Sequence, residues 1–540
     1  MTIVSRNASL PICSRRQLLL VVAPLMLVIA SCAPYFEEIG ESYSSSGAEW
    51  ILTSGFDNVA AIHIDEVALS AVALDALRGL VALEPGLEVD RAGDRVNLRL
   101  DGGELGGVGL PSSQAPAEWA RATVAALELV RKSSSRLRQA SVERIIEVML
   151  DSALAGLDRY SRYASPEEAR ENRAIREGFG GIGVTLERFD HRILIVSVIA
   201  DAPAARAGIK ANDHLLKVDE TAVDDLDVAD IVRLVRGPID STARLQLIGA
   251  GGTDPRTVSV RRALILLPTV RYVVESGAAV IRVSGFNQDT APSLGTALKD
   301  IARAAGRGAI KGVVLDLRAN PGGLLDQAVA VADLFLKDGR IVSTRGRHPD
   351  SMQLFEAGGR DLVEGLPVAV LINGSSASAT EIVAAALQDR GRGVVIGTSS
   401  YGKGTVQTVI RLPNDGELTL TWARFHAPSG YAIDRLGVLP TICTSAAAGD
   451  PALLAASFKR GRLGGLTDLA ARRAVDDPAM RRRDSPAAAC PWRPGEDKGD
   501  FALAAAKHLV TDPALYAGAL AAQAPTAKTD RPQAAARPSP

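Results

Sequence analysis

The stretch Pro367-Val-Ala-Val-Leu-Ile372-Asn-Gly-Ser-Ser-Ala-Ser378-Ala-Thr-Glu381 runs from an apolar segment through small residues into a helical pattern. Short apolar runs without alternation are typical of central strands in a sheet that helices cover on both faces. The glycine and serines that follow predict a tight turn before the helix. The stretch therefore predicts an α/β fold, whose turn presents Ser378 to solvent with the next backbone N–H free.

Similar apolar runs occur on both sides of this stretch and alternate with helical patterns. They are Ala279–Val283, Gly312–Leu317 and Val394–Ile396. Strands that alternate with helices indicate one open sheet in which neighbouring strands are parallel. We therefore expect an α/β core with a central sheet over residues 263–445.

The periodicity of the apolar residues changes twice upstream of this core. Over residues 59–172 they recur mainly at helical spacing, as in Val142–Leu150, and one alternating piece, Val96–Leu100, predicts a strand. Over residues 175–262, short alternating strands surround one helical pattern, which predicts a small β-barrel module. The fold class expected is therefore a multidomain protein that combines α+β and α/β parts.

The N-terminal residues 1–31 are typical of an export signal rather than of a folded domain. Arg15-Arg16 precede an apolar run, Leu18–Ala30, that is too short to span a membrane. The run ends at Ala30-Ser31-Cys32, which resembles a lipobox. We expect cleavage before Cys32 and a lipid on its sulfur, and the alternative is an ordinary signal peptide with a chance cysteine.

A lipid on Cys32 would place the protein on the periplasmic side of a bacterial envelope membrane. Ala33 follows this cysteine, where aspartate is associated with retention in the inner membrane, so the outer membrane is favoured. Residues 32–58 are rich in Ser, Gly and Glu and are expected to form a tether.

The other end of the chain changes in composition. Residues 446–521 predict an Ala-rich helical C-terminal segment, and residues 522–540 predict a disordered tail. Two cysteines, Cys443 and Cys490, remain once Cys13 and Cys32 are assigned to the signal. In an oxidising compartment these two either form a disulfide or remain unpaired and buried.

The charge balance excludes some classes of partner. The chain carries 61 basic and 62 acidic side chains, so its composition gives no argument for binding nucleic acid. None of the six histidines lies in a recognisable catalytic motif, and no Cys/His cluster has zinc spacing. No metal and no cofactor is expected.

A second loop of small residues follows the run Val394–Ile396 and contains Lys403. Gly397–Gly404 nearly matches a phosphate-binding loop, but such a loop must open a helix. The residues that follow, Thr405–Ile410, alternate as a strand does, which argues against nucleotide binding. A neutral lysine can take the proton of a serine hydroxyl, so the two loops together suggest a serine hydrolase without a catalytic histidine. The plainer interpretation of the serine loop is a flexible helix cap.

Two glycine-rich turns complete the set of motifs. Gly178–Val184 precedes a strand, and successive N–H groups there can converge on a carboxylate, although many such runs are turns without a ligand. Asp316–Gly323 ends in Asn-Pro-Gly-Gly, where free N–H groups could face a developing oxyanion. By itself this second run is more often a tight turn.

The small β-rich segment resembles a PDZ domain. Ser197–Ile209 and Asp213–Asp219 stand where PDZ domains carry their characteristic Pro-Ala, Ala-Gly and Gly-Asp pairs, with Asn212 in place of the usual glycine. The resemblance implies that Phe179, Gly180, Gly181 and Ile182 bind the terminal carboxylate of a peptide.

From about Ile145 to Thr441 the chain resembles the carboxyl-terminal processing peptidases, the tail-specific serine protease family with a PDZ domain. The motifs that carry the resemblance follow the order of the family and begin with Gly156–Tyr163. The resemblance implies Ser378 as nucleophile, Lys403 as general base and Gln407 as the group that orients the lysine. It also implies that the backbone N–H of Ala379 and of Gly322 or Gly323 stabilise the oxyanion.

The implied function is a serine endopeptidase that recognises protein C-termini and cleaves or degrades envelope proteins. The alternative class is a non-catalytic PDZ lipoprotein that binds C-terminal tails. An adaptor or a second copy of the chain are further partners that the sequence leaves open. Trp422 and Thr441 depart from the residues usual in the family, threonine and aspartate, which puts substrate fit in question more than activity.

Overall fold

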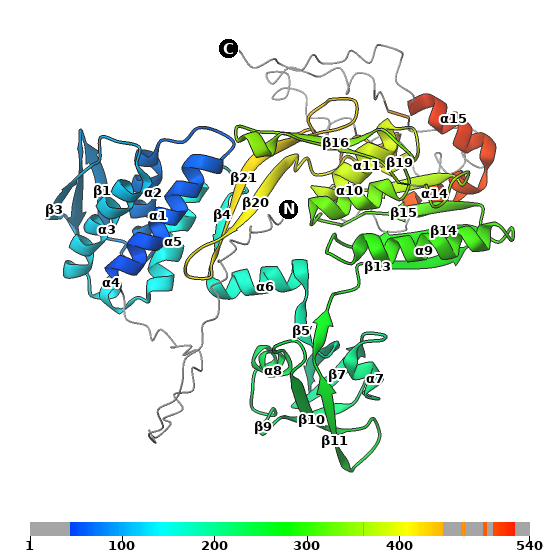
Figure 1. Cartoon of the computed structure of the whole chain (residues 1–540), viewed down its shortest axis with the longest axis horizontal. Helices are drawn as coiled ribbons and strands as arrows, with labels where there is room; N and C mark the ends of the chain where they lie inside the picture. The colour runs from blue at the N-terminus through cyan, green and yellow to red at the C-terminus, as the bar shows by residue number, and fades with distance from the viewer. Residues whose placement is uncertain are drawn as a thin grey trace, which may run out of the picture.

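The computed structural model describes residues 44–359, 361–445, 466–467, 469, 490–493 and 501–523. These residues form a helical domain, a small β domain and an α/β core (Figure 1). The signal segment, Cys32 and most of the predicted tail lie outside the described residues. None of the helices in the described part of the chain is long and apolar enough to cross a bilayer.

The core sheet has the strand order β13-β14-β15-β18-β19-β22. Strands β14 to β22 run parallel, and β13 is antiparallel to β14. This confirms the parallel central sheet that the apolar runs predict. The strands are β13 (Val270–Glu275), β14 (Ala278–Val283), β15 (Gly312–Asp316), β18 (Val368–Ile372), β19 (Val394–Gly397) and β22 (Ile442–Cys443).

Helices cover both faces of this sheet, which explains why its strands read as unbroken apolar runs. One face packs against α9 (Thr290–Ala305), α10 (Leu325–Asp333) and α11 (Ala379–Asp389). The other packs against α14 (Phe501–Thr511) and α15 (Pro513–Gln523), which come from the C-terminal segment. The helix α15 extends to Gln523, so the first two residues of the predicted tail are helical. The Gln523 amide is buried and donates to the carbonyls of Gln388 and Gly393.

A second sheet, which the sequence did not predict, lies beside the first with the order β17-β16-β21-β20. Its strands are β16 (Arg340–Arg345), β17 (Gln353–Glu356), β20 (Thr405–Arg411) and β21 (Glu417–His426), and β4 (Arg162–Ala164) pairs with β21. The β20–β21 hairpin extends into the helical domain (Figure 1), where Leu412, Leu418 and Leu420 join the hydrophobic core. One hairpin therefore belongs to the cores of two domains.

The helical domain begins earlier than the sequence suggests, and the predicted tether at residues 32–58 is wrong from Ser45 onward. Residues 45–62 form α1, whose first turn is capped by the Ser44 hydroxyl, which accepts from the Gly47 N–H. Leu52, Phe56 and Val59 are buried on one helical face. The Ser/Gly-rich start is thus a helix cap.

The rest of the helical domain packs around this first helix. Its helices are α2 (Leu69–Gly79), the short 3₁₀ turn η1 (Leu80–Ala82), α3 (Pro116–Ser133), α4 (Ser135–Gln139) and α5 (Val142–Ala155). The predicted strand near Val96 is β2 (Arg95–Leu100), which lies between β1 (Leu87–Ala92) and β3 (Gly103–Gly109). The turn after α5 leads through β4 into the second sheet of the core.

The small β domain follows α6 (Pro166–Glu177), and its sheet has the order β11-β10-β8-β7-β6. A small β-barrel module was expected; the sheet observed is open, with β11 and β6 at its two ends and no pairing recorded between them in the described residues. Its elements are β6 (Val184–Phe189), β7 (Arg192–Val198), α7 (Pro203–Arg206), β8 (His214–Val218), β9 (Thr221–Ala222), α8 (Val228–Val235), β10 (Thr242–Ile248) and β11 (Pro255–Arg261). A separate pair, β5 (Phe179–Gly181) and β12 (Ala263–Ile265), joins the entry and exit of the domain.

Candidate active site

Ser378 lies at the turn between β18 and α11, where the strand–turn–helix pattern predicts it. Its backbone has φ 58° and ψ −118°, a conformation that is strained for a residue with a side chain. Such a turn holds a serine hydroxyl above the end of the sheet. Ser376, a rival in the same loop, is fully buried and donates to the Leu317 carbonyl 2.9 Å away, so it is structural.

Lys403 lies in the loop between β19 and β20. A strand follows it, as the sequence predicts, and a phosphate-binding loop would require a helix there. The even spacing of Lys403 and Gln407 does not explain their placement, however. Lys403 precedes the first residue of β20, and the register shifts between Val406 and Gln407.

The carboxylate of Glu381 joins the serine loop to the lysine loop. Its Oε2 accepts from the backbone N–H of Ser378 at 2.8 Å and of Lys403 at 2.9 Å. Its Oε1 accepts from the N–H of Gly402 at 2.7 Å and from the Ser400 hydroxyl at 2.5 Å. The two loops therefore meet on one fully buried side chain.

No role was predicted for Glu381 from the sequence, although its spacing from Ser378 carries a signal. An acid three residues after a serine N-cap is typical of a capping box. Burial raises the pKa of Glu381 to about 7, against the opposing hydrogen bonds from Ser400 and the three backbone amides. What the sequence could not show is that the carboxylate also binds the second loop.

The environment of Lys403 favours its neutral form. Burial lowers the pKa of this amine, and the positive charge of Arg162 lowers it further, while Glu381 acts in the opposite direction. The Nζ atom lies 5.2 Å from the centroid of the Tyr160 ring. Among the described residues, no hydrogen bond joins Nζ to the Ser378 hydroxyl; the structure brings together the two loops that carry them.

The Gly322-Gly323 turn packs directly against the serine. A side chain at Gly322 would come within 2.8 Å of the Ser378 Cβ and 3.0 Å of the Ala379 nitrogen, so only glycine fits. The Gly322 N–H already donates to Asn320 Oδ1 at 2.9 Å. The N–H groups of Gly323 and Ala379 have no hydrogen-bond acceptor among the described residues and are the ones available to an oxyanion.

Gln407 lies on β20 with its amide held on one side. Its Nε2 donates to Thr405 Oγ1 at 2.8 Å and to Thr421 Oγ1 at 3.4 Å. This arrangement leaves Oε1 to accept a hydrogen bond from another group. The side chain is therefore placed as an orienting group rather than as an acid or base.

Cys443 and Cys490 form a disulfide in the structure. The bond fixes a short segment against both loops, because the Ser399 N–H donates to the Cys490 carbonyl at 3.0 Å. Trp492 of the same segment packs on Gly374, where an added Cβ would lie 2.7 Å from its ring. The predicted C-terminal segment thus supports the site from outside.

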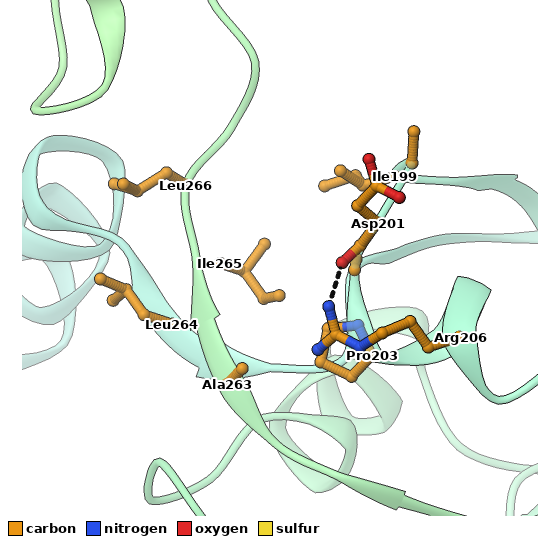
Figure 2. Close-up of a pocket in the computed structure, with 10 residues that line it drawn as sticks. Ile199, Asp201, Pro203, Arg206, Ala263, Leu264, Ile265 and Leu266 are labelled. Carbon is orange, nitrogen blue, oxygen red and sulfur yellow. Dashed lines mark hydrogen bonds between the residues drawn. The ribbon is translucent and has the colours of Figure 1, made fainter. Parts of the chain in front are cut away.

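The residues expected to bind a carboxylate lie apart from this site, in the small β domain. Phe179, Gly180 and Gly181 form β5, opposite Ile265, Leu264 and Ala263, and Ile182 is buried. A cavity of about 210 Å³ lies between α7 and β12, the strand that pairs with β5. Figure 2 shows its mixed lining, in which apolar residues of β12 face Asp201 and Arg206, and the hydrogen bond from Arg206 to the Asp201 carbonyl.

That cavity contains none of the predicted catalytic residues. In the part of the chain that the structure describes, no group of three or more His, Cys, Asp or Glu residues could hold a metal ion. The groups gathered at the candidate site are the Ser378 hydroxyl, the half-buried Lys403 on the adjoining loop, and the N–H groups of Gly323 and Ala379.

The strained turn at Ser378, the adjoining loop with a lysine of lowered pKa and the glycine turn together fit the active site of a serine peptidase. Comparison with known proteins agrees. Residues 277–444 match peptidase family S41, and residues 180–260 match the PDZ domain. The chain belongs to the carboxy-terminal processing proteases, which confirms the resemblance inferred from the motifs.

Two relatives illustrate the extent of the match. A carboxy-terminal-processing protease of Bartonella bacilliformis is 42% identical over 301 residues, which cover 56% of this chain and 69% of the relative. The carboxy-terminal processing protease CtpA of Bacillus subtilis is 34% identical over 303 residues, covering 54% of this chain and 63% of the relative. Among solved structures, a photosystem II D1 C-terminal processing protease shows 22% identity and a TM-score of 0.36, covering 75% of this chain and 96% of its own.

Proposed function

We propose that this PDZ-containing serine protease uses a Ser378/Lys403 dyad to cleave or degrade envelope proteins that it selects by their C-termini. The observation that carries the proposal is the meeting of the serine and lysine loops on Glu381, beside a lysine whose pKa burial lowers. Lys403 takes the proton of Ser378, and the N–H groups of Ala379 and Gly323 bind the oxyanion. The non-catalytic alternative is not favoured, because the relatives are proteases.

In the proposed mode of selection, the C-terminus of the substrate adds as a strand to the outer edge of β6, the last strand of the sheet in the small β domain. Its carboxylate then lies at residues 179–182. The Arg236 guanidinium supplies a positive charge there, since it stacks 4.0 Å from the centroid of the Phe179 ring. Its Nε is buried and has no hydrogen-bond partner among the described residues, so it suits a carboxylate.

We expect Arg236→Gln to raise KM for a peptide with a free C-terminus by about tenfold, because a charge-assisted hydrogen bond is lost. The same peptide with an amidated C-terminus should show an unchanged KM. Steady-state kinetics on both peptides measure the difference. Arg233→Gln, on the exposed face of α8, is the matched control. Equal effects on both peptides would contradict carboxylate binding at this site.

The proposed location is the periplasmic side of the envelope, with a lipid on Cys32 holding the protein to the membrane. Support comes from the lipobox-like residues before this cysteine. Growth with labelled palmitate should label the wild-type protein and leave Cys32→Ala unlabelled. Cys13→Ala, within the cleaved segment, should keep the label. Label that persists in Cys32→Ala would remove the anchor.

A further inference from the structure

The motif Gly156–Tyr163 has no assigned role in the chemistry, yet the structure places it against β21, the strand that pairs with β20 and Gln407. Its Asp158 carboxylate is half-buried and accepts from the backbone N–H of Tyr160 and of Ser161, both through Oδ1. The Ser161 hydroxyl donates to Oδ2 at 2.5 Å. These bonds fix the carboxylate at one place in the turn.

A histidine from the other end of the helical domain holds the second side of this carboxylate. His63 is 1% exposed, and its Nε2 lies 3.1 Å from Asp158 Oδ2. Burial opposes ionisation of Asp158, but the bonds from His63, Ser161 and the backbone outweigh it and hold the pKa of this carboxyl well below its usual value. The group is therefore an acceptor throughout the working pH range.

The carboxylate also reaches the core through Thr421 on β21. The Thr421 hydroxyl donates to Asp158 Oδ1 at 3.0 Å, and its backbone N–H donates to the Ser161 hydroxyl at 3.1 Å. Its carbonyl accepts from the Ile64 N–H at 2.8 Å, beside His63. Thr421 is 2% exposed, so water does not compete for these bonds.

The direction of the Thr421 hydroxyl determines which way the Gln407 amide faces. A hydroxyl has one proton, and an ionised carboxylate can only accept, so this proton points to Asp158. The lone pairs then face Gln407, which must present its NH₂ group and not its oxygen. Thr405 Oγ1 accepts from the same Nε2. The Gln407 Oε1 is thereby the part of the amide that remains to accept a hydrogen bond.

We propose that Asp158 and Thr421 are positioning residues for catalysis: they fix the amide of Gln407 and, through it, the Lys403 amine. The inference rests on the proposed role of Gln407. It extends the active site into the helical domain, because Tyr160 of the same turn lies against Lys403 Nζ. The turn that contains Asp158 and Tyr160 thus contacts both Lys403 and Thr421, the residue that holds the Gln407 amide.

The test uses Thr421, since a change at Asp158 would also free the hydrogen bonds of its turn. Thr421→Val keeps the shape of the side chain and removes the hydroxyl. We expect kcat to fall about tenfold, part of the 10²–10⁴ that a positioned base contributes, with KM unchanged. Thr421→Ser restores the hydroxyl and should restore kcat. Thr419→Val, a buried threonine two residues earlier on β21, should leave kcat unchanged.

A double-mutant cycle separates positioning from a general structural effect. If Thr421 acts through Gln407, then Thr421→Val should not lower kcat further in a Gln407→Ala background. If the two substitutions lower kcat by factors that multiply in the double variant, then Thr421 does not act through Gln407, although Gln407 keeps its own role. A Gln407→Ala variant with wild-type kcat would instead overturn the role of Gln407 and, with it, the positioning role of Thr421 and Asp158. The proposed protease function is tested separately, by loss of cleavage in Ser378→Ala.

Discussion

Ser378→Ala and Lys403→Met should each abolish cleavage of a peptide with an apolar C-terminus and leave the fold intact. The serine provides the attacking oxygen, and Ser376 in the same loop cannot replace it, because Ser376 is buried and bonded to Leu317. Methionine keeps the apolar stem of the lysine and removes its amine. Since acid–base and nucleophilic groups act as a unit, either change should lower kcat by about 10⁴-fold or more.

Each of the two variants has a control of the same residue type. Ser375→Ala changes a serine in the same loop, and Lys299→Met changes an exposed lysine on α9. Both should retain wild-type kcat. Release of a fluorescent peptide product measures activity, and thermal unfolding checks the fold. Wild-type turnover in Ser378→Ala or Lys403→Met would rule out the dyad.

The pH profile of the wild-type enzyme follows from the same residues. The base works only when it is neutral, so kcat/KM rises as pH passes through the pKa of Lys403. Burial and Arg162 lower that pKa, so the rise should occur below the ordinary lysine value of about 10.4.

The α/β core could be predicted from sequence because its strands are short apolar runs that alternate with helices. Val368–Ile372 is buried along its whole length, and nothing polar obscures the pattern. The second sheet was missed for the opposite reason. Strands such as β16 and β17 carry charged and polar residues. The strand β16 also pairs with β21, whose paired residues lie about 80 positions further along the chain, so this pairing could not be predicted from local sequence.

In the candidate site, too, the features set by neighbouring residues could be predicted from the sequence, and the contacts between distant residues could not. The turn at Ser378 and the strand after Lys403 are local features and were predicted correctly. The contact of Asp158 with Thr421 joins residues 263 positions apart and depends on how the helical domain packs on the β20–β21 hairpin. Periodicity carries no information on such a contact. The tether was misread because a helix cap and a flexible linker use the same small polar residues.

Glu381→Gln should lower kcat/KM by about a hundredfold and also destabilise the protein. All four groups around the carboxylate are donors, two on each oxygen. Glutamine must place its NH₂ group against one of these pairs, and each buried donor left without an acceptor costs about 1–3 kcal/mol. The affected pair either joins Ser378 to Lys403 or holds Ser400 and Gly402, so the spacing of the two loops changes in both cases.

The pH dependence of stability distinguishes Glu381 from an ordinary buried polar group. Its pKa is about 7 in the folded protein and about 4.3 in an unfolded chain, so the folded state binds the proton more tightly. The stabilisation from this group is complete below pH of about 4.3 and is lost as pH rises to about 7. The difference in Tm between wild type and Glu381→Gln should therefore shrink over this range. Glu364→Gln, at an exposed position, should show no such trend; a constant difference in Tm for Glu381→Gln would mean that the carboxyl does not titrate there.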